Sequence, residues 1–204
     1  MIDKSIPHYS LTMYNDTPYS YPECALPDGF EFVFYRAGDE VKWAEIECSV
    51  GQFDSLERGL ACFEREFVQN QVLNPCERML FVKDKNGEYV ATASLWDGIF
   101  LGVRRQRIHW VAVKDSCAGL GIAKAMLSRL MKLYRELGYE DSMVYLITGT
   151  RNYPAVAIYR KFGFREYTGP ISLSSKLSDE QFVEQTATAI SIINEKIAQY
   201  KSKK

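Results

Sequence analysis

The sequence predicts an α/β protein, and three stretches carry that prediction. Residues 105–138 combine the features of a strand, a turn of small residues and a long helix. Residues 143–164 repeat that order with a shorter helix. The segment Asp84-Lys85-Asn86-Gly87 lies between two apolar runs and predicts a β-hairpin, because Asn-Gly favours a tight turn between antiparallel strands.

The predicted organisation is an N-terminal arm over 1–29, one domain over 30–173 and a C-terminal helical extension over 174–204. The arm is expected to be irregular and laid over the domain, because tyrosines lie among prolines there. These tyrosines either line a binding pocket or only cover apolar surface. The tyrosines are Tyr9, Tyr14, Tyr19 and Tyr21, and the prolines are Pro7, Pro18, Pro22 and Pro27.

Residues 30–35 are predicted to form the first strand, and a helix capped by its first residue follows over 39–47. Asp54 and Glu57 form a capping-box pattern that opens a second helix to about residue 69. The acidic and aromatic side chains of this pair either attract a basic ligand or belong to amphipathic helices with solvated charges. They are Trp43, Glu45, Glu47, Phe53, Phe63, Glu64 and Phe67.

The hairpin comprises strands over 79–82 and 89–96, after which a loop is expected to lead to the central strand over 108–113. The long helix beyond it ends at Gly138, a residue suited to the position after a helix. The apolar stripe of this helix consists of Ala123, Leu127, Leu130, Met131, Tyr134 and Leu137.

The turn before this helix, residues 118–123, consists largely of small residues that let the backbone approach a ligand. The first N–H groups of a helix have no partner inside it and lie at the positive end of its dipole, so they favour phosphate groups. The alternative is a tight connection in which the glycines serve packing. The neighbouring Cys117 is either a thiol activated by the helix end or a packing residue.

The downstream segment has a strand over 143–148, then Asn152, then a short helix with Pro154 in its first turn and Gly163 after its last. Tyr159 lies on the face of that helix directed toward Asn152. The bland alternative for this phenol is a half-buried packing role.

A strand-like segment over 171–173 precedes a terminal helix capped by Ser178 with Gln181 three residues later. The apolar stripe of this helix either packs on the same domain or forms a dimer contact. The stripe consists of Phe182, Ala189, Ile190, Ile193, Ile197 and Tyr200.

The 204 residues fit one domain, and 47% hydrophobic residues can form a core. A net charge of −1 gives no electrostatic basis for binding nucleic acid. No apolar run approaches a membrane span, and the N-terminus lacks the pattern of a signal peptide. The five cysteines include no C-x-x-C pair, which favours reduced thiols in the cytoplasm and predicts no metal site.

The turn and the downstream segment together resemble the acetyl-CoA-binding half of the GNAT (GCN5-related N-acetyltransferase) superfamily. The family turn, Q/R-x-x-G-x-G/A, matches at residues 118–123. The family's Asn, its helical Tyr and its Gly-Phe pair match at Asn152, Tyr159 and Gly163-Phe164. The resemblance is close over 108–167.

The chain departs from the family pattern at two positions. Ala118 replaces the usual Gln or Arg, which an amide cradle does not need, because its donors are main-chain groups. Asp115 stands where Pro is common, and its charge weakens pyrophosphate binding unless the carboxylate points to solvent.

The resemblance implies a GNAT-like mixed, mostly antiparallel twisted sheet flanked by helices, with acetyl-CoA as co-substrate. It implies that amides from Gly119 to Lys124 hold the pyrophosphate. The pantetheine arm is expected to pair with the main chain of Val111 to Val113, in the gap between the two central strands. The implied cofactor-binding residues are Val111, Ala112, Val113, Ala118, Gly119, Leu120, Gly121, Ile122, Ala123, Lys124, Asn152 and Tyr159.

The resemblance also implies that Tyr159 protonates the departing thiolate and that Asn152 holds the cofactor or its loop. His109 lies on the central strand and is expected to share a face with Val111 and Val113 by the two-residue period. In some family members a His on this strand is the general base toward the amine, and imidazole titrates near neutral pH. The alternative is a hydrogen-bonded core histidine.

The predicted function is transfer of acetyl from acetyl-CoA to a primary amine of a small molecule or peptide, by direct attack in a ternary complex. The family shapes its acceptor site on the helical pair, and the protein is expected to be a monomer or homodimer. One alternative is a non-catalytic acyl-CoA-binding domain. Another is a nucleotide-binding domain, whose ribose partner about 20 residues after the turn falls near Glu140 and Asp141.

Overall fold

The computed structural model describes residues 2–69, 73–139, 143–170 and 177–202. Its internal contacts divide the chain into two units. The first unit consists of Met1–Ile2, Glu23–Trp96 and Ile108–Gly138. The second unit consists of Asp3–Pro22, Asp97–Arg107 and Tyr139–Lys204.

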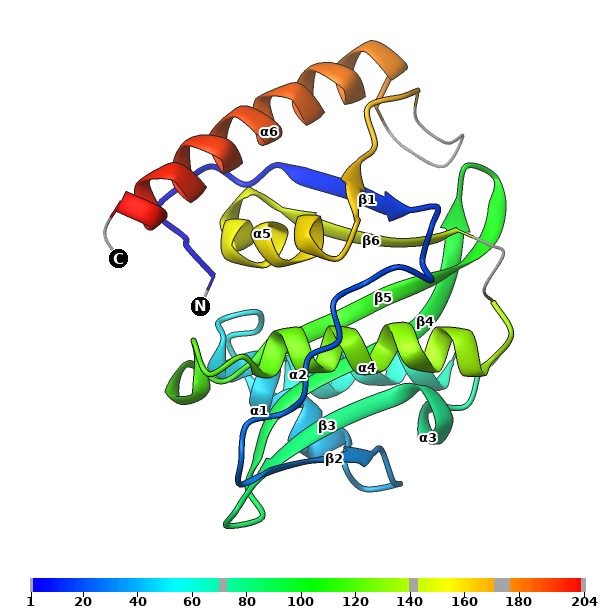
Figure 1. Ribbon diagram of the computed structural model, residues 1–204, viewed down its shortest axis with the longest axis vertical. Coiled ribbons are helices and arrows are strands. Elements are labelled where there is room, and N and C mark those ends of the chain that lie inside the picture. Colours follow the sequence, from blue (N-terminus) through cyan, green and yellow to red (C-terminus); the bar gives the residue numbers. More distant parts are fainter. Residues whose placement is uncertain (1, 70–72, 140–142, 171–176, 203–204) are drawn as a thin grey trace. The chain divides into compact units, whose positions relative to one another are not determined.

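Strands and helices are interspersed along the chain (Figure 1). The strands are β1 (Ser10–Asn15), β2 (Phe30–Phe34), β3 (Met79–Asp84), β4 (Tyr89–Phe100), β5 (Val103–Val113), β6 (Val144–Gly149) and β7 (Arg165–Glu166). The α-helices are α1 (Glu40–Ser49), α2 (Leu56–Phe63), α3 (Pro75–Arg78), α4 (Ile122–Glu136), α5 (Tyr153–Lys161) and α6 (Asp179–Ser202). A π-helix, η1 (Glu64–Val68), continues α2, and η2 (Asp115–Cys117) and η3 (Thr150–Asn152) are 3₁₀ turns.

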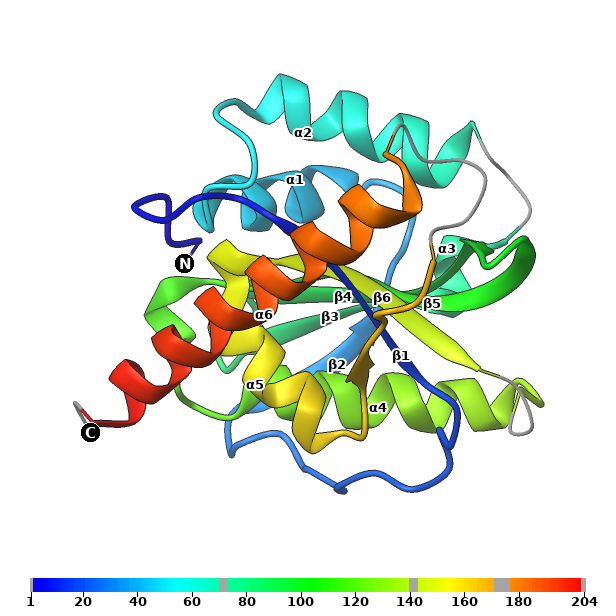
Figure 2. The ribbon, with the colours of Figure 1, turned by 90° about the horizontal axis from the view of Figure 1, so that it is seen from above.

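The sheet of the first unit has the order β2–β3–β4–β5, and β3 pairs antiparallel with both β2 and β4. Helices α1 and α2 cover one face of this sheet and α4 covers the other (Figure 2). Because both faces are covered, β3 is a continuous apolar run, and residues 79–82 are 0% exposed. The predicted turn forms at 84–87, where the Gly87 amide donates to the Asp84 carbonyl at 2.9 Å.

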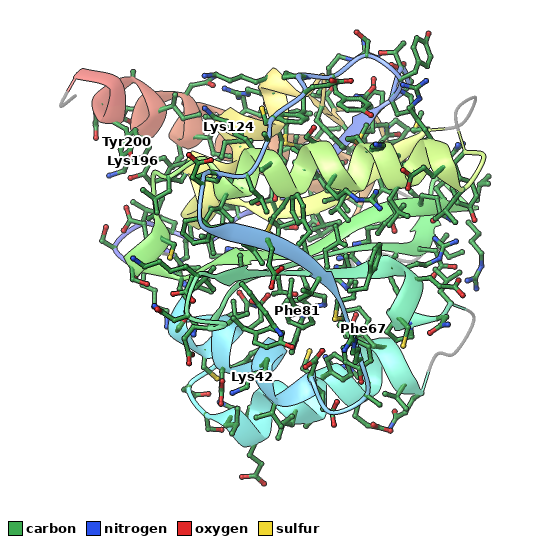
Figure 3. The ribbon with its side chains drawn as sticks, turned by 60° about the horizontal axis from the view of Figure 1, so that its bottom comes forward. Lys42, Phe67, Phe81, Lys124, Lys196 and Tyr200 are labelled. Atoms are coloured by element: carbon green, nitrogen blue, oxygen red, sulfur yellow. The ribbon has the colours of Figure 1, made fainter. Side chains whose placement is uncertain are left out.

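Aromatic side chains fill the layer between this sheet and helices α1 and α2. Phe67 and Phe81, labelled in Figure 3, belong to this cluster and are 0% exposed. Trp43 lies at its centre and is also 0% exposed, with ring contacts to the π-helix and to β5. The layer therefore holds the π-helix and β5 firmly against each other.

In the second unit β1 pairs antiparallel with β6 over its whole length, from Ser10↔Gly149 to Asn15↔Val144, and also with β7. Helix α6 packs against β1, α5 and η3 (Figure 1). Its predicted capping box forms, since the Ser178 amide donates to Gln181 Oε1 at 3.0 Å. Ala189 and Ile193 of its stripe are 0% exposed, so packing within the same unit covers the middle of that stripe, whereas Tyr200 at its end is 46% exposed.

The predicted α/β class with a mostly antiparallel arrangement is confirmed by these pairings. One secondary-structure prediction is wrong: residues 10–15 form a strand rather than part of an irregular arm. The strand has only six residues, over which buried and less buried side chains alternate, and its partner β6 is remote in sequence. Local sequence patterns therefore do not reveal this strand. The strand over 30–34 is consequently the second of the chain, and the central strand is the fifth.

The loop predicted after residue 96 is also wrong. Residues 97–107 instead extend β4 and β5 into a long hairpin that turns at Leu101 and Gly102, with φ of 53° and 73°. Leucine is not a turn signal, so the sequence hides this turn. The strand-like segment predicted at 171–173 lies outside the described residues, and the division at 29/30 and 173/174 stays a prediction.

Glu47 of α1 generates a prediction about stability, because it is only 3% exposed. Burial raises the pKa of this carboxyl from 4.5 to about 8, so the folded protein keeps a proton that the unfolded chain loses. Stability therefore falls as pH rises from about 4.5 to about 8. Glu47→Gln should flatten that fall and raise the urea midpoint near pH 8, whereas Glu45→Gln, on the exposed side of α1, should follow the wild type. An unchanged pH slope in Glu47→Gln would contradict the prediction.

Gly98 generates a second prediction, because a methyl group there would lie 2.2 Å from the Tyr145 hydroxyl oxygen. Tyr145 is 2% exposed, and its ring stacks on Phe100 at 5.0 Å, so it cannot move aside easily. Gly98→Ala should destabilise the protein by about 1–3 kcal/mol. Adding Tyr145→Phe should recover most of that loss in a double-mutant cycle, and strict additivity would disprove the contact.

Candidate active site

The turn before α4 has the conformation that its glycines predict. Gly119 and Gly121 have φ of 82° and 91°, values that side chains rarely adopt, and Gly121 is the N-cap of α4. Ala118, Gly119 and Leu120 are exposed. In this fully described helix the first turn carries no acidic side chain, so the positive end of the dipole is not offset there.

The glycines of this turn do not serve packing. Among the described residues, no atom lies within 4 Å of the place where a methyl group would stand on Gly119 or Gly121. The packing role that the alternative gave to these glycines is therefore wrong, whereas a tight connection between strand and helix stays compatible with the turn. What the glycines provide is backbone conformation beside open space, which is the condition for close approach of a ligand to the main chain.

Two main-chain hydrogen bonds flank the amides of residues 119–123. The Ala118 amide donates to the Asp115 carbonyl and the Lys124 amide to the Gly121 carbonyl, each at 3.0 Å. The amides of 119–123 lie between these two bonds, at the start of the helix, where intrahelical acceptors are lacking. Lys124 keeps an exposed side chain at the beginning of α4 (Figure 3), and Asp115 is exposed to solvent.

Trp110 interrupts the regular course of β5. Its φ of 49° is a left-handed value that costs about 1–3 kcal/mol for a residue other than glycine. A left-handed residue inside a strand breaks the alternation of side chains, and we call this irregularity the bulge at Trp110. The His109 ring lies 6.0 Å from that of Phe67, and the Trp110 ring lies 5.1 Å from that of Trp43. Consecutive side chains thus face the same helical layer.

The predicted face of His109, shared with Val111 and Val113, is therefore wrong. The two-residue period applies to an uninterrupted strand, and the bulge at Trp110 shifts it by one residue. His109, Trp110 and Ala112 all contact the side that α1, α2 and η1 cover.

The His109 side chain forms a polar pair inside the aromatic layer. Its Nε2 lies 3.2 Å from Oε2 of Glu66, and the two side chains are 7% and 30% exposed. This hydrogen bond is the main cause that lowers the pKa of the Glu66 carboxyl. The main chain of His109 is held as well, since Ser94 Oγ donates to its carbonyl at 2.9 Å. His109 is thus hydrogen-bonded through both its main chain and its side chain, and the side-chain partner is the carboxylate of Glu66.

Sequence reasoning missed Glu66. The predicted helix to residue 69 is confirmed in extent, but its last turn is the π-helix η1, marked by the Gln69 amide donating to the Glu64 carbonyl at 2.9 Å. Its N-cap is Ser55, not Asp54, which pairs instead with Arg58 at 2.7 Å. π-Turns occur often at functional sites, but a run such as Glu-Arg-Glu-Phe-Val does not announce one.

The second unit holds Asn152 and Tyr159. Asn152 is the N-cap of α5, although its side chain makes no cap hydrogen bond. Tyr159 is 8% exposed, its ring lies 6.1 Å from that of Phe164, and its carbonyl accepts the Phe164 amide at 3.1 Å. Gly163 has the predicted left-handed conformation, with φ of 82°.

The remaining residues that the sequence analysis singled out differ in burial and in their partners. Among the helix carboxylates, Glu45 pairs with Lys42 at 3.0 Å, Glu64 is exposed and Glu47 is buried. In the arm, Tyr14 packs against Phe100 and Tyr167, whereas Tyr19 is 56% exposed. Cys117 is half-buried, and all five cysteines have free thiols. The proposed ribose partners Glu140 and Asp141 lie outside the described residues.

Neither a cluster of metal ligands nor a membrane-spanning helix is present in the described ranges. His, Cys, Asp and Glu side chains form no group there that could hold a metal ion. None of the described helices combines the length and the apolar character that crossing a membrane requires.

A comparison with family models decides the assignment, because the model of the acetyltransferase (GNAT) family matches residues 18–164. The chain belongs to the GNAT family. The match extends further toward the N-terminus than the turn and the downstream segment, and it includes the helical pair and the β3–β4 hairpin of this GNAT protein.

Curated relatives are similar over part of the chain. An N-alpha-acetyltransferase of Sulfurisphaera tokodaii is 31% identical over 102 residues, which is 46% of this chain and 60% of that protein. An N-alpha-acetyltransferase of Sulfolobus acidocaldarius is 34% identical over 64 residues, 31% of this chain and 38% of that protein. The matched regions thus span less than two thirds of these relatives.

Solved structures share the fold. A GCN5-related N-acetyltransferase from Sphaerobacter thermophilus has a TM-score of 0.60 at 23% identity, over 78% of this chain and 49% of that chain. A predicted acetyltransferase from Clostridium acetobutylicum, solved with acetyl-CoA, has a TM-score of 0.53 at 18% identity, over 71% and 96% of the two chains. These likenesses support the GNAT fold of the present chain.

The turn before α4 generates a prediction with a matched control. Gly119 and Gly87 have φ of 82° and 81°, and a methyl group on either would stand in open space. Gly119→Ala and Gly87→Ala should therefore lose similar stability, about 1–2 kcal/mol each. Only Gly119→Ala should weaken acetyl-CoA binding in calorimetry, by about tenfold, because it disturbs the amides that are proposed to bind a charged group. Equal affinities for the two variants would remove the turn from the binding site.

Proposed function

We propose that this GNAT protein is an acetyl-CoA-dependent N-acetyltransferase acting on a primary amine. The observation that carries the proposal is the turn over 118–121, which is exposed at 118–120 and whose left-handed glycines border open space at the start of α4. Main-chain N–H groups in that arrangement suit a pyrophosphate. The family model over 18–164 supports acetyl-CoA as the ligand that brings this pyrophosphate.

The pantetheine arm would pair with the main chain of Val111 to Val113, directly after the bulge at Trp110. The left-handed angle of Trp110 departs from extended backbone, so main-chain groups beside it can turn toward a ligand. An N–H near Val111 would donate to the thioester oxygen as negative charge develops on it. A donor of this kind contributes about 2.7–4 kcal/mol to the stability of such a transition state.

The proposed reaction is direct transfer without an acyl-enzyme. The neutral amine nitrogen attacks the thioester carbonyl carbon, a C–N bond forms and the C–S bond breaks. The proton of the amine passes to His109 or to water, and Tyr159 protonates the departing thiolate. The products are the N-acetyl amide and free CoA, and solvent restores the proton to Tyr159. Asn152 would hold the cofactor or its loop.

A peptide α-amino group is the first acceptor to test, because two relatives are named N-alpha-acetyltransferase. A panel should compare a peptide with a free N-terminus, the same peptide with that N-terminus blocked but a lysine present, a polyamine and a free amino acid. Thiol release from acetyl-CoA reports turnover for each amine. Release with the free N-terminus alone would assign the acceptor class.

The rival functions make different predictions in binding experiments. A nucleotide-binding domain should bind NAD or ATP more tightly than acetyl-CoA in calorimetry. A non-catalytic acyl-CoA-binding domain should bind acetyl-CoA but release no thiol with any amine. An acetyltransferase should do both. Preference for NAD or ATP would overturn the proposal.

Tyr159→Phe provides the prediction that separates an enzyme from a binder. Removal of the phenolic hydroxyl should lower kcat by about 100-fold, because general acid catalysis contributes at least that much. Acetyl-CoA affinity should persist, since the ring and its contact with Phe164 remain. Unchanged turnover would exclude Tyr159 as the acid.

A further inference from the structure

We propose that Glu66 is a positioning residue for His109, holding the imidazole ring in place and balancing the charge that the ring gains on protonation. The inference rests on the proposed function, in which His109 takes the proton of the acceptor amine. Glu66 itself acts through His109 and is not assigned contact with the substrate.

The distance between the two side chains fixes the chemistry of the pair. Nε2 of His109 lies 3.2 Å from Oε2 of Glu66, and an ionised carboxylate can only accept a hydrogen bond. Nε2 therefore carries the hydrogen, and in the neutral ring the basic lone pair is on Nδ1. The carboxylate thus selects one of the two tautomers of the ring, which is the role that a partner of a catalytic histidine performs.

The surroundings hold the ring against rotation. It lies among the rings of Phe67, at 6.0 Å, and Trp110, at 5.3 Å, and its own carbonyl is tied to Ser94. The side chain of His109 is only 7% exposed. A buried imidazole that acquires a positive charge needs a nearby negative one, because desolvation penalises the charged form.

The π-helix explains why the carboxylate reaches this point. Helix α2 is regular to Phe63, and the wider turn that follows buries Phe67 completely while leaving Glu66 30% exposed beside it. Glu64, in the same π-helix, is exposed. The sequence thus provides two glutamates on one short element, of which one meets the histidine and the other provides a control.

Other titratable side chains near the Glu66–His109 pair come from η1, α2 and α1. Arg65 of η1 lies 3.2 Å from the other oxygen of Glu66 and donates to Cys62 Sγ of α2 at 3.0 Å. Glu47 of α1 is buried, and burial keeps it largely protonated near neutral pH. Arg65 is largely exposed, so solvent screens the effect of its charge on the pair. Glu66 is the carboxylate within hydrogen-bond distance of His109.

The pair is reciprocal in energy. The hydrogen bond from His109 lowers the pKa of Glu66, so the ionised carboxylate must favour the protonated imidazole to the same extent. Removal of the charge from Glu66 should make His109 a weaker base. Removal of a merely structural contact would lower activity without changing basicity.

An NMR titration tests the pair without any substrate. His8 and His109 are the only histidines in the sequence, so His8→Ala leaves one imidazole signal to follow. In that background Glu66→Gln should lower the titration midpoint of His109 by about one pH unit or more. Glu64→Gln removes the same charge from the same π-helix and should leave the midpoint unchanged. An unchanged midpoint in Glu66→Gln would overturn the pairing.

A second measurement needs no change at Glu66. Ring ¹⁵N shifts of His109 in the otherwise wild-type protein should report a hydrogen on Nε2 at high pH. The Nδ1–H tautomer would overturn the proposal, whether or not the Glu66 variants fold.

A pH–rate profile with acetyl-CoA and a free-N-terminus peptide tests the role in the reaction. Glu66→Gln should move the acid limb of kcat/KM to lower pH and lower kcat by about tenfold or more, with KM for acetyl-CoA unchanged. Glu66→Asp should move the acid limb part of the way back toward its wild-type pH, because it restores the negative charge. A limb that stays in place in Glu66→Gln would overturn the positioning role alone. No transfer to any amine by the wild type would overturn the proposed function as well, and the NMR results distinguish these cases.

Discussion

The bulge at Trp110 is the constraint on which the rest of the first unit depends. A bulky residue at φ 49° stores strain, and the packing of its ring against Trp43 and Phe53 opposes that strain. The break places His109 and Trp110 on one face of β5, against the helical layer. The same departure from extended backbone lies directly before Val111, the residue whose main chain is proposed to donate to the thioester oxygen. One backbone angle therefore arranges both the imidazole and the proposed thioester site.

The helical layer that packs against β5 also contains an irregular element, the π-helix η1. A regular helix from Ser55 onward would bury one continuous stripe, whereas the π-turn brings a carboxylate to the margin of that stripe. Glu66 and His109 meet because two departures from regular structure, one in a helix and one in a strand, face each other across an aromatic core. Such departures persist only where surrounding packing over-determines them, which the fully buried Trp43 and Phe67 achieve here.

The sequence was sufficient wherever the cause of structure is local. The capping box at Ser178, the turn ending at Gly87 and the left-handed glycines around α4 all follow from a few adjacent residues. The exposed amide turn was predictable for the same reason. The sequence was insufficient where the cause is tertiary: β1 depends on a distant partner, and Leu101 and Trp110 adopt conformations that their own chemistry disfavours. Glu66 could be found only after the phase of its helix was known.

The pairing of β1 with β6 has a consequence for how the chain is made. Ser10 is synthesised well before its partner Gly149. Until then β1 exposes unpaired edge groups, and its eventual docking requires closure of a very long loop. The strand β1 also receives its cover from α6, which follows β7 in the chain. We therefore expect this unit to complete its folding only once α6 has been synthesised, with contacts of high sequence separation making that step slow.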